Sequence, residues 1–213
     1  LPVILKTTSP RAWAFALIGI HEYLRRFEGD RRANQVRDKL AGRLLTLYKN
    51  SRSDDWCWYE AGLSYCNAVL PQALLMCGQW IPNKAMTEAG LESLHWLADL
   101  QRADAAGGHF VPIGSNGFYQ RGGERARFDQ QPVEAQTMAS ACLEAYRSTG
   151  DKRWHKEARR AFEWFLGRND LNIPVYDPTT GGCRDGLHPD RPNENQGAES
   201  TLAFLQTLLE LRL

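Results

Sequence analysis

Apolar residues recur with helical spacing along seven segments of the chain, and no Val-, Ile- and Thr-rich strand pairs appear between them. The segments are about 10–28, 33–48, 58–77, 84–101, 132–149, 151–166 and 197–212. The third, fifth and seventh are apolar on most faces, whereas the second, fourth and sixth have one charged face. A helix that is apolar all round is expected to be covered on all sides, and an amphipathic helix exposes one face. The alternation therefore predicts an all-α fold of helical hairpins, an (α/α) toroid with inner and outer helices.

Seven helices are too few to close a ring of six hairpins. The toroid is therefore partial, or residues before Leu1 are missing, and the chain begins without a start methionine. We expect residues 1–213 to form a single toroid domain that is a fragment of a longer chain. Pro71 lies inside the third predicted helix, where the missing N–H predicts a kink or an interruption.

Two long segments without helical period, about 104–131 and 169–195, precede the fifth and seventh helices. In a toroid such loops lie at one end of the molecule and lead into the N-termini of the inner helices. Loops longer than about 12–15 residues in a compact domain are usually functional. The site is therefore expected at the end of the helical stack that carries these loops.

Three of the predicted helices open with a similar phrase, an acid followed five residues later by a glutamate and then a small residue. The phrases begin at Asp55, Asp129 and Glu194. If the helix starts converge, they bring together the candidate catalytic acids Glu60, Asp129, Glu134 and Glu199. Two carboxylates in one cleft can act as acid and base on a glycosidic bond. The structural alternative is that each glutamate caps its own helix and interacts with the helix dipole.

Other polar and aromatic side chains near these helix starts suit a sugar ligand. Sugar rings stack on aromatic faces, and their hydroxyls bond to Asp, Asn, Gln and Arg; plain packing is the alternative for a Trp beside a buried helix. Arg127, in a run rich in Arg and Gly, could hold an anion or could neutralise neighbouring acids together with Arg125. The predicted substrate-binding residues are Trp58, Tyr59, Tyr119, Arg127, Gln131, Asp185, His188 and Asn195.

Composition excludes several classes of function. A net charge of +1 gives no electrostatic basis for binding nucleic acid, and no apolar stretch approaches the length of a membrane span. The segment 181–190 contains Cys, His and Asp without a second Cys or His at ligand spacing, so no metal site is predicted, and no cofactor motif appears. The odd set of five cysteines without a CxxC pair predicts unpaired thiols and a cytoplasmic location.

Three stretches of the sequence resemble a known family: DDWCWYEAGLSYCNAVLPQAL, GERARFDQQPVEAQT and YDPTTGGCRDGLHPDRPNENQGAEST. They are similar to helical domains of bacterial proteins in which a nucleotide-sugar glycosyltransferase module precedes the domain or is encoded nearby. They are also similar to the six-hairpin glycosidase-like superfamily of (α/α) toroids. The resemblance covers nearly the whole chain and implies the toroid fold. It also implies a glycosyltransferase module as a partner, from which a glycosyltransferase name would derive.

The leading interpretation is a carbohydrate-active domain that binds an oligosaccharide or glycoconjugate and, if it is an enzyme, cleaves a glycosidic bond with two carboxylates. A second interpretation is a non-catalytic glycan-binding or scaffold module of a glycosyltransferase. A third is a uronate lyase or sugar epimerase that uses a His or Tyr base and Arg127. Hydrolysis requires two carboxylates about 5–9.5 Å apart, whereas a lyase or epimerase requires an Arg and a His or Tyr at the same cleft.

Overall fold

The computed structural model describes residues 2–103 and 108–212, so part of the predicted loop 104–131 lies outside the described residues. The chain divides into two compact units. Unit 1 comprises Leu1–Ala61 and Val69–Trp96, and unit 2 comprises Gly62–Ala68 and Leu97–Leu213. The expectation that residues 1–213 form a single domain stays a prediction.

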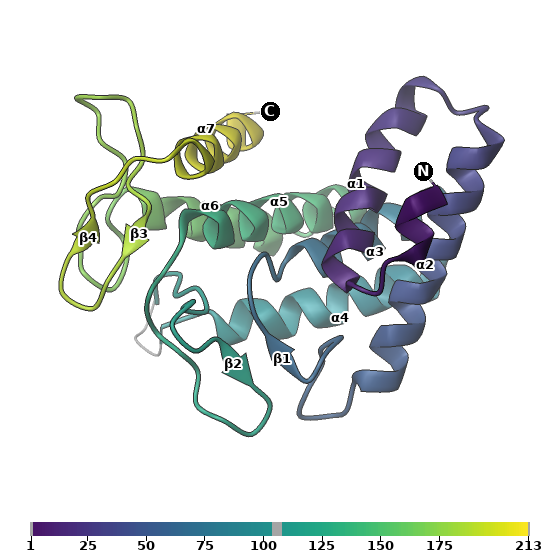
Figure 1. The fold of residues 1–213 in the computed structure, drawn as a ribbon, viewed down its shortest axis with the longest axis horizontal. Coiled ribbons are helices and arrows are strands. Elements are labelled where there is room, and N and C mark those ends of the chain that lie inside the picture. The colour runs from purple at the N-terminus through teal and green to yellow at the C-terminus, as the bar shows by residue number, and fades with distance from the viewer. Residues whose placement is uncertain (1, 104–107, 213) are drawn as a thin grey trace. The chain divides into compact units, whose positions relative to one another are not determined.

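Unit 1 is helical. It contains a 3₁₀ helix, η1, and the α-helices α1, α2 and α3 together with most of α4 (Figure 1). The bounds of these helices are η1 Pro2–Lys6, α1 Pro10–Arg26, α2 Arg31–Ser51, α3 Val69–Trp80 and α4 Lys84–Leu100. Helix α1 packs against α2 and α3. Two caps define these helices locally: Ser9 accepts the N–H of Ala12, and Asp30 accepts the N–H groups of Arg32 and Ala33. The predicted first, second and fourth helices are confirmed.

The third predicted helix begins too early. Residues 58–68 are not helical, and α3 begins at Val69. Pro71 therefore lies in the first turn of α3, where the lost N–H has no partner inside the helix. Of the two expectations for Pro71, the interruption fits the structure, because the predicted helix is broken before Val69. Gly62 and Leu63 are not helical because they pair with the distant strand at Tyr119–Gln120, and the apolar residues Trp58, Tyr59 and Leu63 are buried all the same.

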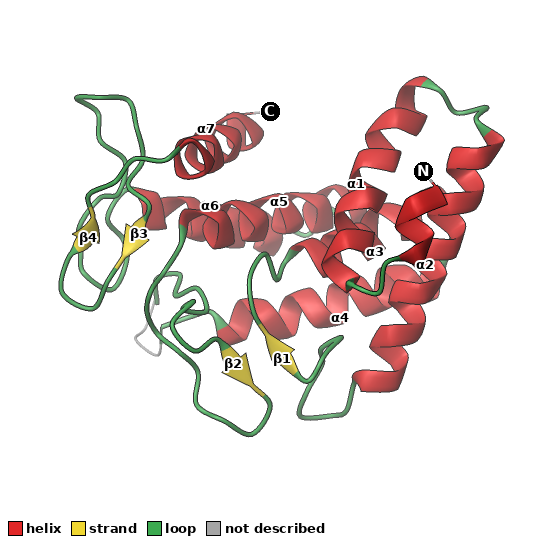
Figure 2. Cartoon of the chain, in the orientation of Figure 1, coloured by secondary structure: helices red, strands yellow, loops and turns green. Residues whose placement is uncertain are grey.

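The described part of unit 2 contains the end of α4 and the helices α5 (Pro132–Thr149), α6 (Lys152–Phe165) and α7 (Ala198–Arg212), and α5 packs against α6 and α7. Gly150 ends α5 in a left-handed conformation, with φ 70°, and Asp151 caps α6. Figure 2 shows the four short strands, which form two antiparallel pairs: β1 (Gly62–Leu63) with β2 (Tyr119–Gln120), and β3 (Gly186–Leu187) with β4 (Pro192–Asn193).

Helix α7 differs from its prediction as a helix covered on most faces. One face packs Ala203 and Phe204 into unit 2, where the Phe204 ring stacks on Tyr176 with a centroid distance of 4.1 Å. The opposite face exposes three leucines at helical spacing, Leu202, Leu205 and Leu209. Apolar content alone therefore overstated the burial of this helix.

Candidate functional site

The side chains of Asp129 and His188 meet in unit 2. His188 Nδ1 lies 2.6 Å from Asp129 Oδ1, and the two side chains are 32% and 38% exposed. His188 Nε2 makes no hydrogen bond to any of the described residues. A carboxylate on Nδ1 fixes the imidazole tautomer and the orientation of the ring. The arrangement leaves Nε2 able to take up or release a proton at the surface.

A main-chain bridge brings these two residues together. The N–H groups of Gln130 and Leu187 each donate to the carbonyl oxygen of the other, at 2.9 Å in both cases. In an antiparallel bridge the flanking residues face each other, so Asp129 lies opposite His188. Gly186, with φ 153°, allows this approach, because a side chain there would collide with the carbonyl oxygen of Gln130.

The main chain of Asp129 is also held from the other side. Its carbonyl oxygen accepts the N–H of Ser115 at 2.9 Å and the hydroxyl of Ser115 at 3.2 Å. Gly114 lies directly against the backbone of Phe128 and leaves no room for a Cβ. The loop before α5 is thus closely packed on itself, and these contacts hold the main chain from which the Asp129 side chain extends.

Glu134 lies at the third position of α5, as predicted, but it does not face solvent. The residue is 3% exposed. Its Oε1 accepts the N–H of Cys66 at 2.5 Å, and its Oε2 lies 3.5 Å from the N–H and 3.3 Å from the side-chain amide of Asn67. The carboxylate therefore fastens the segment Gly62–Ala68 to the start of α5.

Asp185 and Asn195 bond to each other beside the start of α7. Asp185 Oδ1 accepts the N–H of Gly197 at 2.8 Å and the hydroxyl of Ser200 at 2.6 Å, and Oδ2 accepts the side-chain amide of Asn195. Burial would raise the pKa of Asp185, but the hydrogen bonds from Ser200, Asn195 and Gly197 outweigh it and hold the pKa below its usual range. Asp185 and Asn195 thus have hydrogen-bonding partners within the chain, at the start of α7, and these contacts do not require a bound sugar.

Asp170 was not predicted, yet it has the densest set of partners in the unit. Its side chain is 3% exposed and accepts hydrogen bonds from Arg127 Nε and Nη2 at 2.8 Å, and from His109 Nε2 and Gln130 Nε2 at 2.7 Å. Burial would raise the pKa of Asp170, but the bonds from Arg127 and His109 lower it below its usual range. Asp170 lies shortly after the end of α6, in a turn whose sequence has no feature that marks a functional acid. The arginines at 121, 125 and 127 were the one indication in the sequence that a buried acid needs a partner.

Arg127 thus forms a bidentate ion pair with Asp170. The interpretation that Arg127 neutralises an acid fits this contact, although the acid lies 43 residues away rather than beside it. A bidentate pair occupies the edge of the guanidinium that would otherwise hold a carboxylate. The structure therefore disfavours Arg127 as the anion-binding group of a uronate site.

The remaining predicted residues of unit 2 lie at its surface or partly buried. Glu199 is exposed at the second position of α7 and makes no hydrogen bond or ion pair within the described residues. Gln131 is the N-cap of α5 but makes no side-chain cap bond. Tyr119, in β2, is half-buried opposite Leu63.

In unit 1, two predicted sugar-binding aromatics are core residues. Trp58 and Tyr59 are both 0% exposed, and their stacking on a sugar stays a prediction. Trp58 stacks on Trp96 with a centroid distance of 5.8 Å, and the Tyr59 hydroxyl bonds to Ser93 at 2.9 Å. Both rings thus pack on α4 within unit 1.

Glu60 is not at a helix N-terminus either, because the predicted helix around it does not form. Its Oε2 accepts a hydrogen bond from Arg11 Nη1 at 2.5 Å, in an ion pair whose arginine is almost fully buried. Glu60 and the glutamates of unit 2 lie in different units, and their predicted convergence stays a prediction.

Unit 1 also presents an acid pair that sequence reasoning left out, Asp54 and Asp55. Both are exposed in a turn closed by main-chain hydrogen bonds between Ser53 and Trp56, at 3.0 and 3.2 Å. The Asp55 carboxylate accepts the Ser53 hydroxyl at 2.5 Å. Asp54 directly precedes the first repeated phrase, which begins at Asp55, and these two consecutive acids could have indicated the pair.

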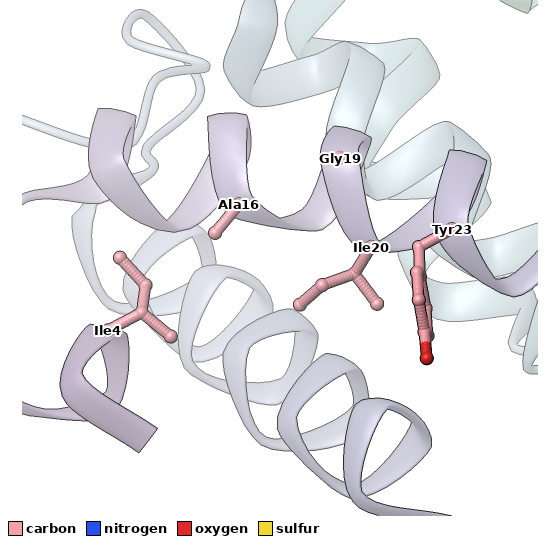
Figure 3. Close-up of a pocket in the computed structure, with 5 residues that line it drawn as sticks. All are labelled: Ile4, Ala16, Gly19, Ile20 and Tyr23. Carbon is pink, nitrogen blue, oxygen red and sulfur yellow. The ribbon is translucent and has the colours of Figure 1, made fainter. Parts of the chain in front are cut away.

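An apolar pocket of about 520 Å³ lies elsewhere in unit 1, between η1 and α1. Figure 3 shows its lining, Ile4, Ala16, Gly19, Ile20 and Tyr23, which has no carboxylate or imidazole. The pocket therefore does not suit acid–base chemistry on a sugar. Within residues 2–103 and 108–212, no cluster of three or more His, Cys, Asp or Glu could hold a metal ion, and no helix is long and apolar enough to cross a membrane.

The five cysteines all lie within the described part of the chain, and none is bonded to another. Burial raises the pKa of Cys77, Cys142 and Cys183 to about 12, so these thiols are neutral. Cys57 is half-exposed at the end of the Asp54–Asp55 turn. The prediction of unpaired thiols agrees with this structure, and the cytoplasmic location stays a prediction.

No protein-family model and no curated protein matches the chain at a significant level. Solved structures do match. The GH76A α-1,6-mannanase from Salegentibacter sp. HEL1_6 superposes with a TM-score of 0.61 at 13% identity, over 94% of this chain and 54% of that one. Two inactive variants of that enzyme, one with α-1,6-mannotriose and one with α-1,6-mannotetraose, match with TM-scores of 0.61 and 0.60 at 14% identity, each over the same fractions. The chain thus spans about half of these structures, and the likeness shows its fold: an all-α, partial (α/α) toroid of the kind found in glycoside hydrolases.

Proposed function

We propose that this chain is a carbohydrate-active domain that binds an oligosaccharide at the Asp129–His188 pair and uses it in hydrolysis of a glycosidic bond. The observation that carries the proposal is the 2.6 Å contact between Asp129 Oδ1 and His188 Nδ1, in a side-chain pair that is only partly buried. The fold shared with mannanases supports a glycan as the ligand.

The chemistry of the pair follows from its geometry. With Nδ1–H donating to Asp129, the Nε2 lone pair of His188 can remove a proton from a water molecule or a sugar hydroxyl. The Asp129 carboxylate holds the ring in this orientation through Nδ1. Positioned general acid–base groups contribute about 10²–10⁴-fold to rate, so the pair could supply a substantial part of the catalysis.

The other predicted acids of unit 2 have different roles in this proposal. Glu134 and Asp185 are fastened by main-chain N–H groups, so we assign them to structure. Glu199 is exposed at the start of α7 and has no hydrogen-bonding partner in the described residues, so we assign it as the second carboxylate, which hydrolysis requires. Half-buried Tyr119 and Gln131 are the proposed sugar contacts in unit 2.

A second candidate centre lies in unit 1. The two inactive mannanase variants carry substitutions at a pair of consecutive aspartates. This sequence has a single Asp-Asp pair, at Asp54–Asp55, and both side chains are exposed. As a glycosidase pair, one would protonate the glycosidic oxygen and the other would attack the anomeric carbon or activate water.

The two other interpretations make different demands on the molecule. A uronate lyase or epimerase would use His188 as the base, but it would need a cation other than Arg127, whose guanidinium edge is held by Asp170. A non-catalytic module serving a glycosyltransferase would bind a glycan without turnover. That partner, like the oligosaccharide, belongs to the proposal.

One set of variants separates these candidates. The protein is incubated with α-1,6-mannotriose, α-1,6-mannotetraose and a panel of neutral and uronate-containing oligosaccharides, and products are separated by chromatography. We expect His188→Gln and Asp129→Asn to lower turnover by about 10²-fold or more, while Asp54→Asn and Asp55→Asn leave it near the original level. Loss of turnover only in the Asp54 and Asp55 variants would move the reaction to unit 1. Unsaturated products would indicate a lyase, and binding that survives all four substitutions would exclude both centres.

A further inference from the structure

Behind the Asp129–His188 pair, the buried carboxylate of Asp170 gathers donors from two separate segments of the chain. His109 comes from the segment after α4, and Arg127 and Gln130 come from the segment that leads into α5. We propose that Asp170 is a positioning residue for the Asp129–His188 pair and acts through Gln130. This inference rests on the proposed function, because it assigns a residue that prepares that same centre.

The first step is the orientation of the Gln130 side chain. Gln130 is 0% exposed, and its Nε2 donates to Asp170 Oδ2 at 2.7 Å while its Oε1 accepts the indole N–H of Trp164 at 2.8 Å. The indole only donates and the carboxylate only accepts, so the amide has one orientation that satisfies both. Asp170 and Trp164 thereby hold the two ends of the Gln130 amide, and Asp170 holds the Nε2 end.

The second step runs through the main chain of Gln130. Its N–H and C=O both pair with Leu187. Asp129 directly precedes Gln130 in the chain, and His188 directly follows Leu187. A shift of Gln130 therefore disturbs the main-chain bridge that sets the positions of Asp129 and His188. A displacement of about 1 Å in a catalytic group can cost about 100-fold in rate.

The third step concerns the charge of Asp170. Its two oxygens accept four N–H bonds, two of them from the Arg127 guanidinium. An asparagine in this place would turn an NH₂ group toward one pair of these donors. The buried network would then contain an unsatisfied donor, and Arg127 would lose the carboxylate of its bidentate ion pair. A partly satisfied buried network is expected to rearrange. The network thus requires the carboxylate and not merely the shape of the side chain.

A spectroscopic signature makes this testable without turnover. The His188 Nδ1 proton shared with Asp129 should give a downfield proton resonance, assigned by its absence in His188→Gln. We expect Asp170→Asn to abolish or shift this resonance and to lower kcat by about 100-fold with little change in KM. Asp177→Asn is the matched control, because Asp177 also accepts hydrogen bonds in unit 2, from Thr179 and Gln196, but takes no part in the network. It should leave the resonance unchanged.

Arg127→Gln is the second variant, since the Arg127 side chain is 58% exposed and its replacement should leave the fold intact. It should weaken the same resonance. An unchanged His188 resonance and kcat in folded Asp170→Asn or Arg127→Gln protein would overturn the proposal. If no glycan is turned over but the resonance responds to Asp170→Asn, the positioning role stands and the proposed function fails. If turnover depends on His188 but not on Asp170, the positioning role alone fails.

Discussion

Replacing Glu134 with glutamine shows whether this carboxylate holds the chain or handles a glycan. Glu134 is 3% exposed, and its oxygens accept the main-chain N–H groups of Cys66, at 2.5 Å, and Asn67, at 3.5 Å. A glutamine keeps one acceptor oxygen and places an NH₂ group where the other oxygen stood. One N–H group then faces a donor inside the protein, where water cannot replace the lost acceptor.

The expected cost follows from these contacts. A hydrogen bond to a charged group contributes about 1.5–3 kcal/mol, and an unsatisfied buried donor costs about 1–3 kcal/mol. The lost charge at the helix N-terminus adds about 0.3–1 kcal/mol. Because the contacts of Asn67 are long, we expect a destabilisation of about 3 kcal/mol, which for a chain of this length lowers Tm by roughly 6–12 °C.

Glu199→Gln is the matched control for stability. Glu199 also lies in the first turn of a helix but is exposed and makes no hydrogen bond within the described residues. Its replacement should change stability by less than about 0.5 kcal/mol. Thermal unfolding followed by circular dichroism measures both variants, and glycan binding is measured on the same samples. A Glu134→Gln protein with an unchanged Tm and no glycan binding would refute the structural role and restore Glu134 as a functional acid.

Three further predictions follow from other parts of the chain. Alkylation of the native protein should modify half-exposed Cys57 well before Cys142, whose pKa burial raises to about 12, and equal rates by mass spectrometry would contradict that burial. Gly186→Ala should cost about 2 kcal/mol or more in urea unfolding and weaken glycan binding, because φ is 153° and the new methyl group meets the Gln130 carbonyl; an unchanged midpoint would argue against this close approach. The pKa of Asp185 is lower in the folded protein than in the unfolded chain, so its contribution is present above the unfolded pKa and is lost as pH falls through the folded pKa. Unfolding between about pH 5 and pH 2 should therefore show a shallower acid loss in Asp185→Asn, and identical pH profiles would exclude this contribution.

The sequence predicted the helices whose ends carry their own signals. Ser9, Pro132 and Gly150 mark helix boundaries through bonds or dihedral angles within a few residues, and the structure has boundaries there. The third helix was predicted to begin too early because Gly62 and Leu63 form a strand that pairs with Gln120 and Tyr119, which lie far along the chain. Apolar periodicity cannot separate a buried loop from a buried helix, since both place apolar residues inward.

The candidate site shows the same division between local and distant information. Asp129 and His188 could be predicted as site residues from their residue types and from their positions in the two long loops. Their contact, however, depends on the main-chain bridge between Gln130 and Leu187. Asp170 could not be found, because its four donors come from positions 40 to 61 residues away. Residue type predicts what chemistry is available, and the pairing of distant segments decides which groups can use it.

The most direct test of the central claim is a titration of the protein with α-1,6-mannotetraose, followed through the ring signals of the five histidines by nuclear magnetic resonance. If an oligosaccharide binds at the Asp129–His188 pair, the His188 signals shift and saturate, the shifts disappear in Asp129→Asn, and His21 in unit 1 does not respond. Repeating the titration with the wider oligosaccharide panel covers other sugars. Saturable glycan binding that leaves the His188 signals unmoved would contradict the account.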